Sequence, residues 1–295
     1  MEEKNMTALV SCFVRAYHYK NKKYKIFNDN IAEKILSDDE YDSISYNMSN
    51  GIKFFNPNFI RDKKDALRWI VDNQLSPSVL GRSIFCEKSL NTAIRIGCKQ
   101  YLIYASGYDT YAYRNIFKSL KIFEIDRAEM IDDKIKRLKI NNLDYSKVNF
   151  IKCDFTNDDW INSVTKSKYN KNEISFSSLL GISYYLTKDE FKKMIKHISS
   201  IICDGSSIVF DYPTYEDSDV MKNNETLAKG ANECMKSKYN YEEIEKILSD
   251  NNLLIYEHLN NVEMTNTYFK SYNMFNPDNK IKAPKGVNYC LAVKK

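Results

Sequence analysis

The spacing of apolar residues divides the chain into two parts of different character. Up to residue 97 apolar positions recur at the helical period, as Val10 and Val14 do. This period predicts helices over 7–36 and 57–97, with Gly97 as the residue that ends the second segment. The first part of the chain is therefore expected to be helical.

From residue 100 onward, short apolar runs alternate with helical stretches. The runs typical of strands are 101–104, 121–125, 148–151, 174–180, 207–211, 253–258 and 288–293. The helical patterns between them are 127–139, 158–165, 188–202 and 241–249. Such alternation indicates βαβ units. We therefore expect an α/β fold with seven strands in a mainly parallel sheet and helices on both faces.

Two segments lie outside this alternation. Residues 1–98 are expected to form a helical N-terminal cap, and residues 213–240 a helical insertion or lid. The core is then made of 99–212 and 241–295. Because no repeat or proline-rich linker interrupts the chain, we treat it as one domain.

Composition narrows the class of protein. Hydrophobic residues make up 43% of the chain and charged residues 28%, which is typical of a globular protein. The net charge of +5 comes from lysines that alternate with acids, which favours a solvated surface over a nucleic-acid-binding stripe. No apolar run has membrane-spanning length, so we expect no membrane partner.

The pattern of cysteines bears on the cellular compartment of the protein and gives no support for a metal centre. The seven cysteines are widely spaced and form no CxxC or Cys/His cluster. Neither a metal site nor a disulfide framework is therefore supported. Reduced thiols and the absence of a secretion signal predict a cytoplasmic protein.

Candidate ligand-binding residues follow the first predicted strand. Ala105 and Gly107 form a small-residue turn, and Asp109 comes just after it. In an open α/β sheet, ligands bind beyond the carboxyl ends of the strands, and small residues let the backbone approach them closely. A single glycine in a turn is more often just part of an ordinary turn.

Carboxylates end the next two predicted strands. Asp126 can accept hydrogen bonds from both hydroxyls of a ribose, or can simply cap a helix. Asp154 can accept from an adenine amino group while Phe155 covers the base. A helix cap followed by a core phenylalanine is the competing interpretation of that pair.

Four segments in this order resemble the leucine carboxyl methyltransferase family, including its bacterial small-molecule O-methyltransferase branch. The segments are YASGYDTYAYR, FEIDRAEMI, KCDFTNDDW and LLGISYYLTKDE. The family patterns are LGxGxDTRxxR, an acidic EVD, a DL or DF, and an E-G/C-x-x-x-Y-L segment. The match spans residues 82–211. It implies a seven-stranded Rossmann-like methyltransferase sheet that binds S-adenosylmethionine (SAM).

The resemblance also implies roles for individual residues. Arg82 would pair with the SAM carboxylate, a task that suits the planar fork of a guanidinium, and Arg15 would assist. Ala105, Gly107 and Asp109 would form the turn beside the methionine part.

The remaining family positions concern the nucleoside and the acceptor. Asp126 would bind the ribose, and Asp154 with Phe155 would hold the adenine. Tyr185 would face the transferred methyl group or the substrate.

Three positions depart from the family pattern. Ala105 replaces a glycine, Tyr111 an arginine, and Leu180 the glutamate of the fourth strand. Leucine offers neither a hydrogen bond nor a charge. An alternative is therefore a catalytically altered SAM-binding or protein-interaction relative.

The expected activity is SAM-dependent methylation of a carboxylate or hydroxyl on a small molecule or peptide-like acceptor. A hydroxyl needs a general base, and His18 is the candidate among the three histidines because it lies in the N-terminal helix.

An NAD-dependent oxidoreductase lacks support because no GxGxxG turn is present. RNA methylation lacks support because no aromatic-basic platform is visible.

Overall fold

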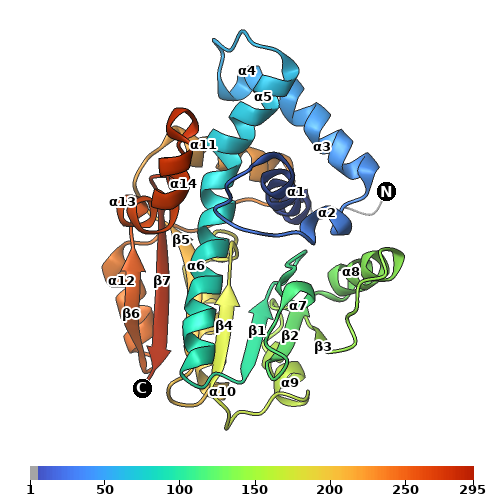
Figure 1. Cartoon of the computed structure of the whole chain (residues 1–295). Coiled ribbons are helices and arrows are strands. Elements are labelled where there is room, and N and C mark those ends of the chain that lie inside the picture. The colour runs from blue at the N-terminus through green and yellow to red at the C-terminus, as the bar shows by residue number, and fades with distance from the viewer. Residues whose placement is uncertain (1–5) are drawn as a thin grey trace.

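The computed structural model describes residues 6–295 and contains one seven-stranded sheet (Figure 1). The strands are β1 (Gln100–Tyr104), β2 (Lys121–Asp126), β3 (Val148–Lys152), β4 (Ser175–Leu179), β5 (Ser207–Pro213), β6 (Leu253–Leu259) and β7 (Val287–Lys294). Their order is β3-β2-β1-β4-β5-β7-β6. Strand β7 runs antiparallel to β5 and β6, and the other neighbours are parallel. The predicted α/β fold is confirmed.

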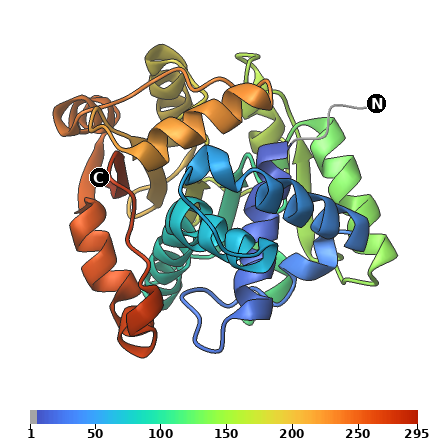
Figure 2. The same ribbon diagram turned by 90° about the horizontal axis from the view of Figure 1, so that it is seen from above.

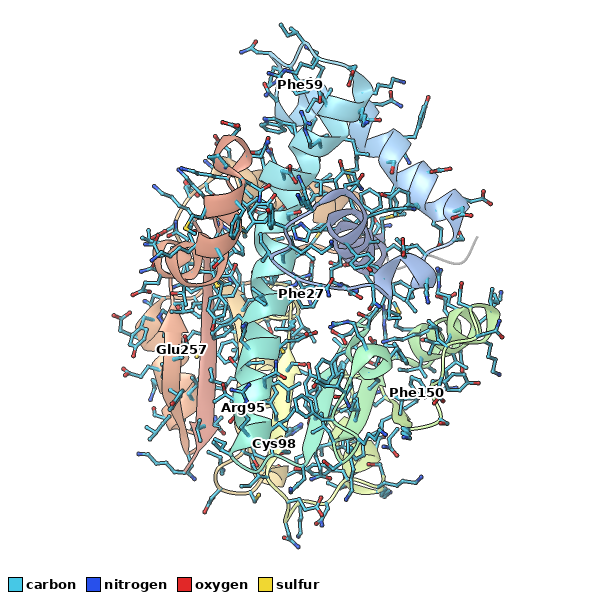
Figure 3. All side chains as sticks on the ribbon, viewed as in Figure 1. Phe27, Phe59, Arg95, Cys98, Phe150 and Glu257 are labelled. Atoms are coloured by element: carbon cyan, nitrogen blue, oxygen red, sulfur yellow. The ribbon has the colours of Figure 1, made fainter. Side chains whose placement is uncertain are left out.

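The centre of the sheet is buried on both faces, as the helices on either side require. Every residue of β1 and β4 is buried. Phe150 of β3 and Glu257 of β6 mark the two outer strands in Figure 3. Because the winding direction reverses between β1 and β4, the carboxyl ends of these strands form the place where such sheets bind ligands.

The helices of the core lie where their apolar period predicts them. They are α8 (Ala128–Ile140), α9 (Trp160–Thr165), α10 (Lys188–Ile201) and α12 (Tyr241–Ser249). The short helix α7 (Tyr111–Arg114) was not predicted. Helix α10 begins with a capping box in which Thr187 and Glu190 each accept from the other's backbone N–H. Its apolar face, which includes Phe191 and Ile195, is buried against the sheet.

The N-terminal cap is helical but divided differently from the prediction. Its elements are α1 (Met6–Asn21), α2 (Ala32–Ile35), α3 (Asp38–Asn50), α4 (Ile52–Phe55), α5 (Lys63–Ile70), η1 (Val71–Leu75) and α6 (Ser76–Arg95). The continuous helix predicted over 7–36 is wrong, because residues 22–31 form a loop. The Asp29 carboxylate accepts from the N–H groups of Ile31 and Ala32, so this side chain fixes the start of α2.

The long helix of the cap packs against the sheet. Helix α6 contacts β4, β5 and β7, and η1 is a π-helical segment that joins it to α5. At Gly81 a Cβ atom would lie 2.7 Å from the Tyr289 hydroxyl oxygen, so glycine permits this close approach. Gly97 ends the segment with φ 115°, as predicted, and the Cys98 N–H bonds to the Ala93 carbonyl.

The lid segment, residues 213–240, contains one helix, α11 (Asp219–Gly230). Gln74 of η1 is buried and donates to the Val220 carbonyl and the Asn224 Oδ1. These bonds fix α11 to the cap. Seen from above, the cap helices and α11 together cover the carboxyl end of the sheet (Figure 2).

The chain between β6 and β7 carries further helices that the sequence reading did not include. They are α13 (Asn261–Met264), η2 (Thr265–Phe269), α14 (Lys270–Phe275) and η3 (Pro277–Asn279). Within residues 6–295, no helix combines the length and the apolarity that crossing a membrane requires.

A buried ion pair joins α8 to the sheet and gives the first prediction. Lys134 Nζ lies 2.7 Å from Glu124 Oε2 with both side chains fully buried, and the Tyr113 hydroxyl donates to Glu124 Oε1. Lys134→Met is expected to lower the free energy of unfolding by about 3–5 kcal/mol, because it leaves a buried carboxylate unpaired. Urea denaturation at neutral pH measures this loss.

The control is the double variant Glu124→Gln/Lys134→Met, which keeps an acceptor for Tyr113 and removes both charges. It should recover most of the lost stability. Equal destabilisation by the single and double variants would show that packing, rather than the unpaired charge, sets the cost.

Candidate functional site

A cavity of about 650 Å³ lies at the carboxyl ends of the strands, between the sheet, the N-terminal cap and the lid segment. Residues that follow β1, β2, β3 and β4 line its sheet side, and residues of α1, α6 and α11 line its cap side. This is the position at which a doubly wound sheet holds its ligand.

The cavity brings together nearly all of the predicted site residues. Those that line it are Arg15, Arg82, Ala105, Gly107, Asp109, Asp126, Asp154, Phe155 and Tyr185. They come from segments far apart in the sequence, which the parallel sheet places at one edge.

The turn after β1 presents backbone to the cavity. Ala105 has φ 52° and Gly107 has φ 46°, both in the left-handed region. A left-handed alanine costs about 1 kcal/mol, so the turn keeps a conformation that glycine adopts more readily. The Ser106 N–H bonds to the Ile125 carbonyl, which ties the turn to β2.

Asp126 ends β2 and faces this turn. Its Oδ2 accepts from the Gly107 N–H at 2.7 Å, and its Oδ1 accepts from the Arg127 N–H at 2.8 Å. Burial raises the pKa of Asp126, while these two N–H groups act in the opposite direction. The carboxylate is thus fixed in the lining of the cavity, where lone pairs not used by the backbone can receive ligand hydroxyls.

Arg82 reaches the cavity from α6. Its Nη2 donates to Ser11 Oγ at 2.9 Å, and its Nη1 lies 3.9 Å from Asp211 Oδ2. Gly181, with φ 68°, allows this placement because a Cβ there would lie 2.7 Å from Arg82 Nη1. A guanidinium held in this way still has N–H groups available for a carboxylate ligand.

Asp211 is the site residue that the sequence reading missed. It lies in β5 and is buried, accepting from the Gly181 N–H at 2.7 Å and the Tyr184 hydroxyl at 2.9 Å. Leu180 lines the cavity but brings no charge, so Asp211 is the carboxylate beside Arg82. An acid within the apolar run SIVFDYP is the signal that could have identified it.

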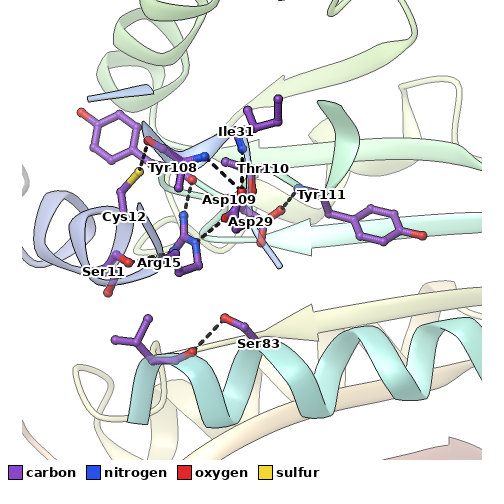
Figure 4. A network of polar contacts seen from close by, with 12 residues as sticks. Ser11, Cys12, Arg15, Asp29, Ile31, Ser83, Tyr108, Asp109, Thr110 and Tyr111 are labelled. Atoms are coloured by element: carbon purple, nitrogen blue, oxygen red, sulfur yellow. Dashed lines mark hydrogen bonds and ion pairs between the residues drawn. The ribbon is translucent and has the colours of Figure 1, made fainter. Parts of the chain in front are cut away.

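Arg15 is largely engaged within the protein (Figure 4). Its Nε donates to Asp29 Oδ2 at 2.9 Å, its Nη2 to the Tyr108 carbonyl at 2.7 Å, and its Nη1 to the Ser11 carbonyl. A ligand carboxylate that bound Arg15, as predicted, would therefore have to compete with three protein acceptors for its N–H groups. The geometry instead makes Arg15 a link between α1 and the turn after β1.

Asp29 is the other half of that link. It also accepts from Thr110 Oγ1 at 2.6 Å and lies 3.3 Å from Arg114 Nε. Burial raises the pKa of Asp29, but the charges of Arg15 and Arg114 outweigh it and hold the pKa below its usual range. The side chain is therefore an anion that two arginines share.

His18 lies outside the cavity lining, and its predicted role as general base is wrong. The side chain is buried, and its Nε2 accepts from the Ile26 N–H at 2.9 Å. Burial, with help from Lys22 and Lys25, lowers the pKa of His18 to about 3. It holds the loop after α1 and has no access to a substrate. The other histidines lie in α10 and β6, as expected.

Asp154 and Phe155 line the cavity just after β3. The Asp154 side chain is exposed and accepts from the backbone N–H and the Oγ1 of Thr156, which lower its pKa. Phe155 packs edge-on against Trp160 with ring centroids 5.2 Å apart. The Phe155 ring is thus held in place next to the exposed carboxylate of Asp154.

The Asp29 network generates a stability prediction. Asp29→Asn should lower the free energy of unfolding by about 3 kcal/mol at pH 7, since the buried Arg15 would lose its counter-ion. Arg114 would lose one of its two carboxylate partners and keep Glu87. Because the folded-state pKa is lowered, the contribution is present above the unfolded value of about 4 and is lost as the pH falls through the folded value. Urea unfolding at pH 7 and pH 3 should show the difference from wild type shrinking in acid.

The matched control is Asp65→Asn, which breaks an exposed pair with Arg68. It should change stability little at either pH. A similar loss from both variants would argue against the buried network.

Comparison with known proteins agrees with this geometry. The family model for leucine carboxyl methyltransferase matches residues 8–199. YktD of Bacillus subtilis, a protein assigned to the SAM-dependent methyltransferases, is 35% identical over 99% of both chains. A DUF574-family protein from Streptomyces avermitilis has the same fold, with a TM-score of 0.62, 11% identity and coverage of 98% of this chain and 97% of that one.

A second solved structure, a protein from Thermobifida fusca assigned as a methyltransferase, superposes with a TM-score of 0.57. It is 12% identical and covers 100% of this chain and 96% of its own, so it supports the fold alone. The match of the family model and the similarity to YktD carry the assignment. The chain belongs to the leucine carboxyl methyltransferase family.

Proposed function

We propose that this protein transfers the methyl group of SAM to an oxygen atom, carboxylate or hydroxyl, of a small molecule or peptide-like acceptor. As a member of its family it is a SAM-dependent methyltransferase. The observation that carries the proposal is the hydrogen bond between Asp126 and the small-residue turn after β1, both of which line the cavity. We place the activity in the cytosol, in keeping with seven free cysteines.

The cavity suits a nucleoside cofactor together with an acceptor. Its volume of about 650 Å³ lies within the usual range of small-molecule sites. Asp126 would bind the ribose, Asp154 and Phe155 the adenine, and Arg82 the carboxylate. The backbone of the turn at Gly107 would lie against the methionine part.

The chemistry asks little of the protein beyond alignment. SAM supplies an activated methyl group whose bond to sulfur breaks as the bond to oxygen forms. The residues around the cavity have to align the acceptor oxygen and exclude water. The cap and α11, which lie over the carboxyl end of the sheet, would serve this purpose. Tyr185, which lines the cavity after β4, would lie beside the acceptor.

Calorimetric titration with SAM and with S-adenosylhomocysteine (SAH) tests cofactor binding. The wild type should bind both, and Asp126→Ala should bind about 100-fold more weakly, because hydrogen bonds to a charged acceptor are lost. Asp132→Ala, an exposed carboxylate on α8, is the matched control and should bind normally. A folded protein that binds neither ligand would contradict the proposal.

A second variant tests the role of Asp211 as the residue that positions Arg82. Asp211→Asn is expected to weaken SAH binding about tenfold, since the guanidinium loses its charged neighbour. Affinity for 5′-methylthioadenosine should stay the same, because that ligand has no carboxylate. Equal weakening for both ligands would indicate general disruption of the site instead.

A further inference from the structure

We propose that the methyl acceptor is a neutral, largely apolar molecule presenting a hydroxyl group, and that the acceptor side of the cavity disfavours carboxylates. This inference rests on the proposed transfer of a methyl group to oxygen. It separates two acceptor classes that the proposed function leaves open.

The cap side of the cavity is rich in methionine. Four of the nine methionines line it, namely Met6, Met48, Met221 and Met235. They come from α1, α3, α11 and the chain after α11, so separate elements converge on one wall. Methionine is unbranched and polarisable, and it adapts to apolar ligands of irregular shape.

Aliphatic residues complete this wall. Val10, Leu75, Val79 and Leu227 line the same side of the cavity. The acids assigned to SAM follow β1, β2 and β3 on the sheet side, whereas Arg15 of α1 and Arg82 of α6 reach the cavity from the cap side. The methionine and aliphatic residues form an apolar part of the lining that binding of SAM leaves unused, and we assign this part to the acceptor.

The cationic residues that line the cavity within residues 6–295 are all engaged or distant from this wall. Arg15 and Arg82 lie beside buried aspartates. Arg127 directly follows the carboxylate assigned to the ribose. Lys236 is 48% exposed and lies 3.5 Å from Glu190. A carboxylate acceptor would therefore find its counter-ion either at Arg82, the position assigned to SAM, or at an exposed lysine that already lies beside Glu190.

The acidic side chain of Glu233 lies in the part of the cavity that we assign to the acceptor. Glu233, from the lid segment, lines the cavity and accepts a hydrogen bond from Thr7 Oγ1 of α1 at 2.5 Å. Burial and the negative charge of Glu233 raise the pKa of Tyr185 to about 12. The field of this carboxylate thus reaches the side chain that we place beside the acceptor.

These features select between acceptor classes. A carboxylate entering the apolar wall loses hydration and meets the negative charge of Glu233, and both effects are unfavourable. A hydroxyl loses less hydration and can donate to the Glu233 carboxylate, which would take up the hydroxyl proton as the methyl group moves from sulfur to oxygen. The same wall therefore admits the alcohol or phenol and disfavours the acid of the same skeleton.

Binding of 4-butylphenol and 4-butylbenzoate to the SAH-saturated protein tests the inference, because the two probes differ mainly in charge at pH 7.5. Calorimetry should show the phenol binding at least about tenfold more tightly. Tighter binding of the benzoate, or no binding of either probe, would overturn the inference while leaving SAH binding intact. Failure to bind SAH would contradict the proposed function itself.

A variant identifies the source of the preference. Glu233→Gln should raise benzoate affinity about three- to tenfold, and about 0.5 M salt should reduce this gain by screening. Glu225→Gln is the control, since Glu225 is an exposed acid of α11 that lies outside the cavity lining. An unchanged preference in Glu233→Gln, or the same change in both variants, would overturn the role of Glu233.

Discussion

The carboxylate of Asp29 is buried, and it is shared by Arg15 of α1 and Arg114 of α7. Thr110 and the first N–H groups of α2 also donate to it. One side chain thus joins the N-terminal cap to the turn after β1. Because a buried anion of this kind is stable only with all its partners in place, the cap has one position over the sheet. The cavity exists because that position leaves space above the strand ends.

The dependence of the cap on tertiary contacts also explains which features the sequence could predict and which it could not. The strands and core helices follow from apolar runs and helical periods, which are local patterns, and their bounds agree with the structure within a few residues. The loop over 22–31 was missed because its conformation depends on Asp29 and His18, whose partners are set by tertiary contacts. The capping box of Ser37 and Glu40 at the start of α3 was visible in the sequence and was overlooked.

The candidate site shows a similar division. Asp126 and Asp154 were found from their places after predicted strands, and Arg82 was found through a family resemblance; the parallel sheet explains why the two carboxylates meet at one edge. Asp211 was not found, because its proximity to Arg82 arises from the packing of α6 on β5. His18 was misassigned for the converse reason: its helix borders the cavity, but its side chain points into the cap. The sequence thus predicted which elements border the cavity, whereas the direction of each side chain became known only from the three-dimensional structure.

The cavity combines carboxylates that follow the strands of the sheet with arginines and an apolar, methionine-rich lining contributed largely by the cap and the lid segment. The most direct test of this account is a crystal structure of the protein with SAH. The account predicts the ribose hydroxyls on Asp126, the adenine beside Phe155 and the carboxylate on Arg82, with the methionine-lined space left open. SAH bound elsewhere, or bound with its carboxylate toward the methionine wall, would contradict it.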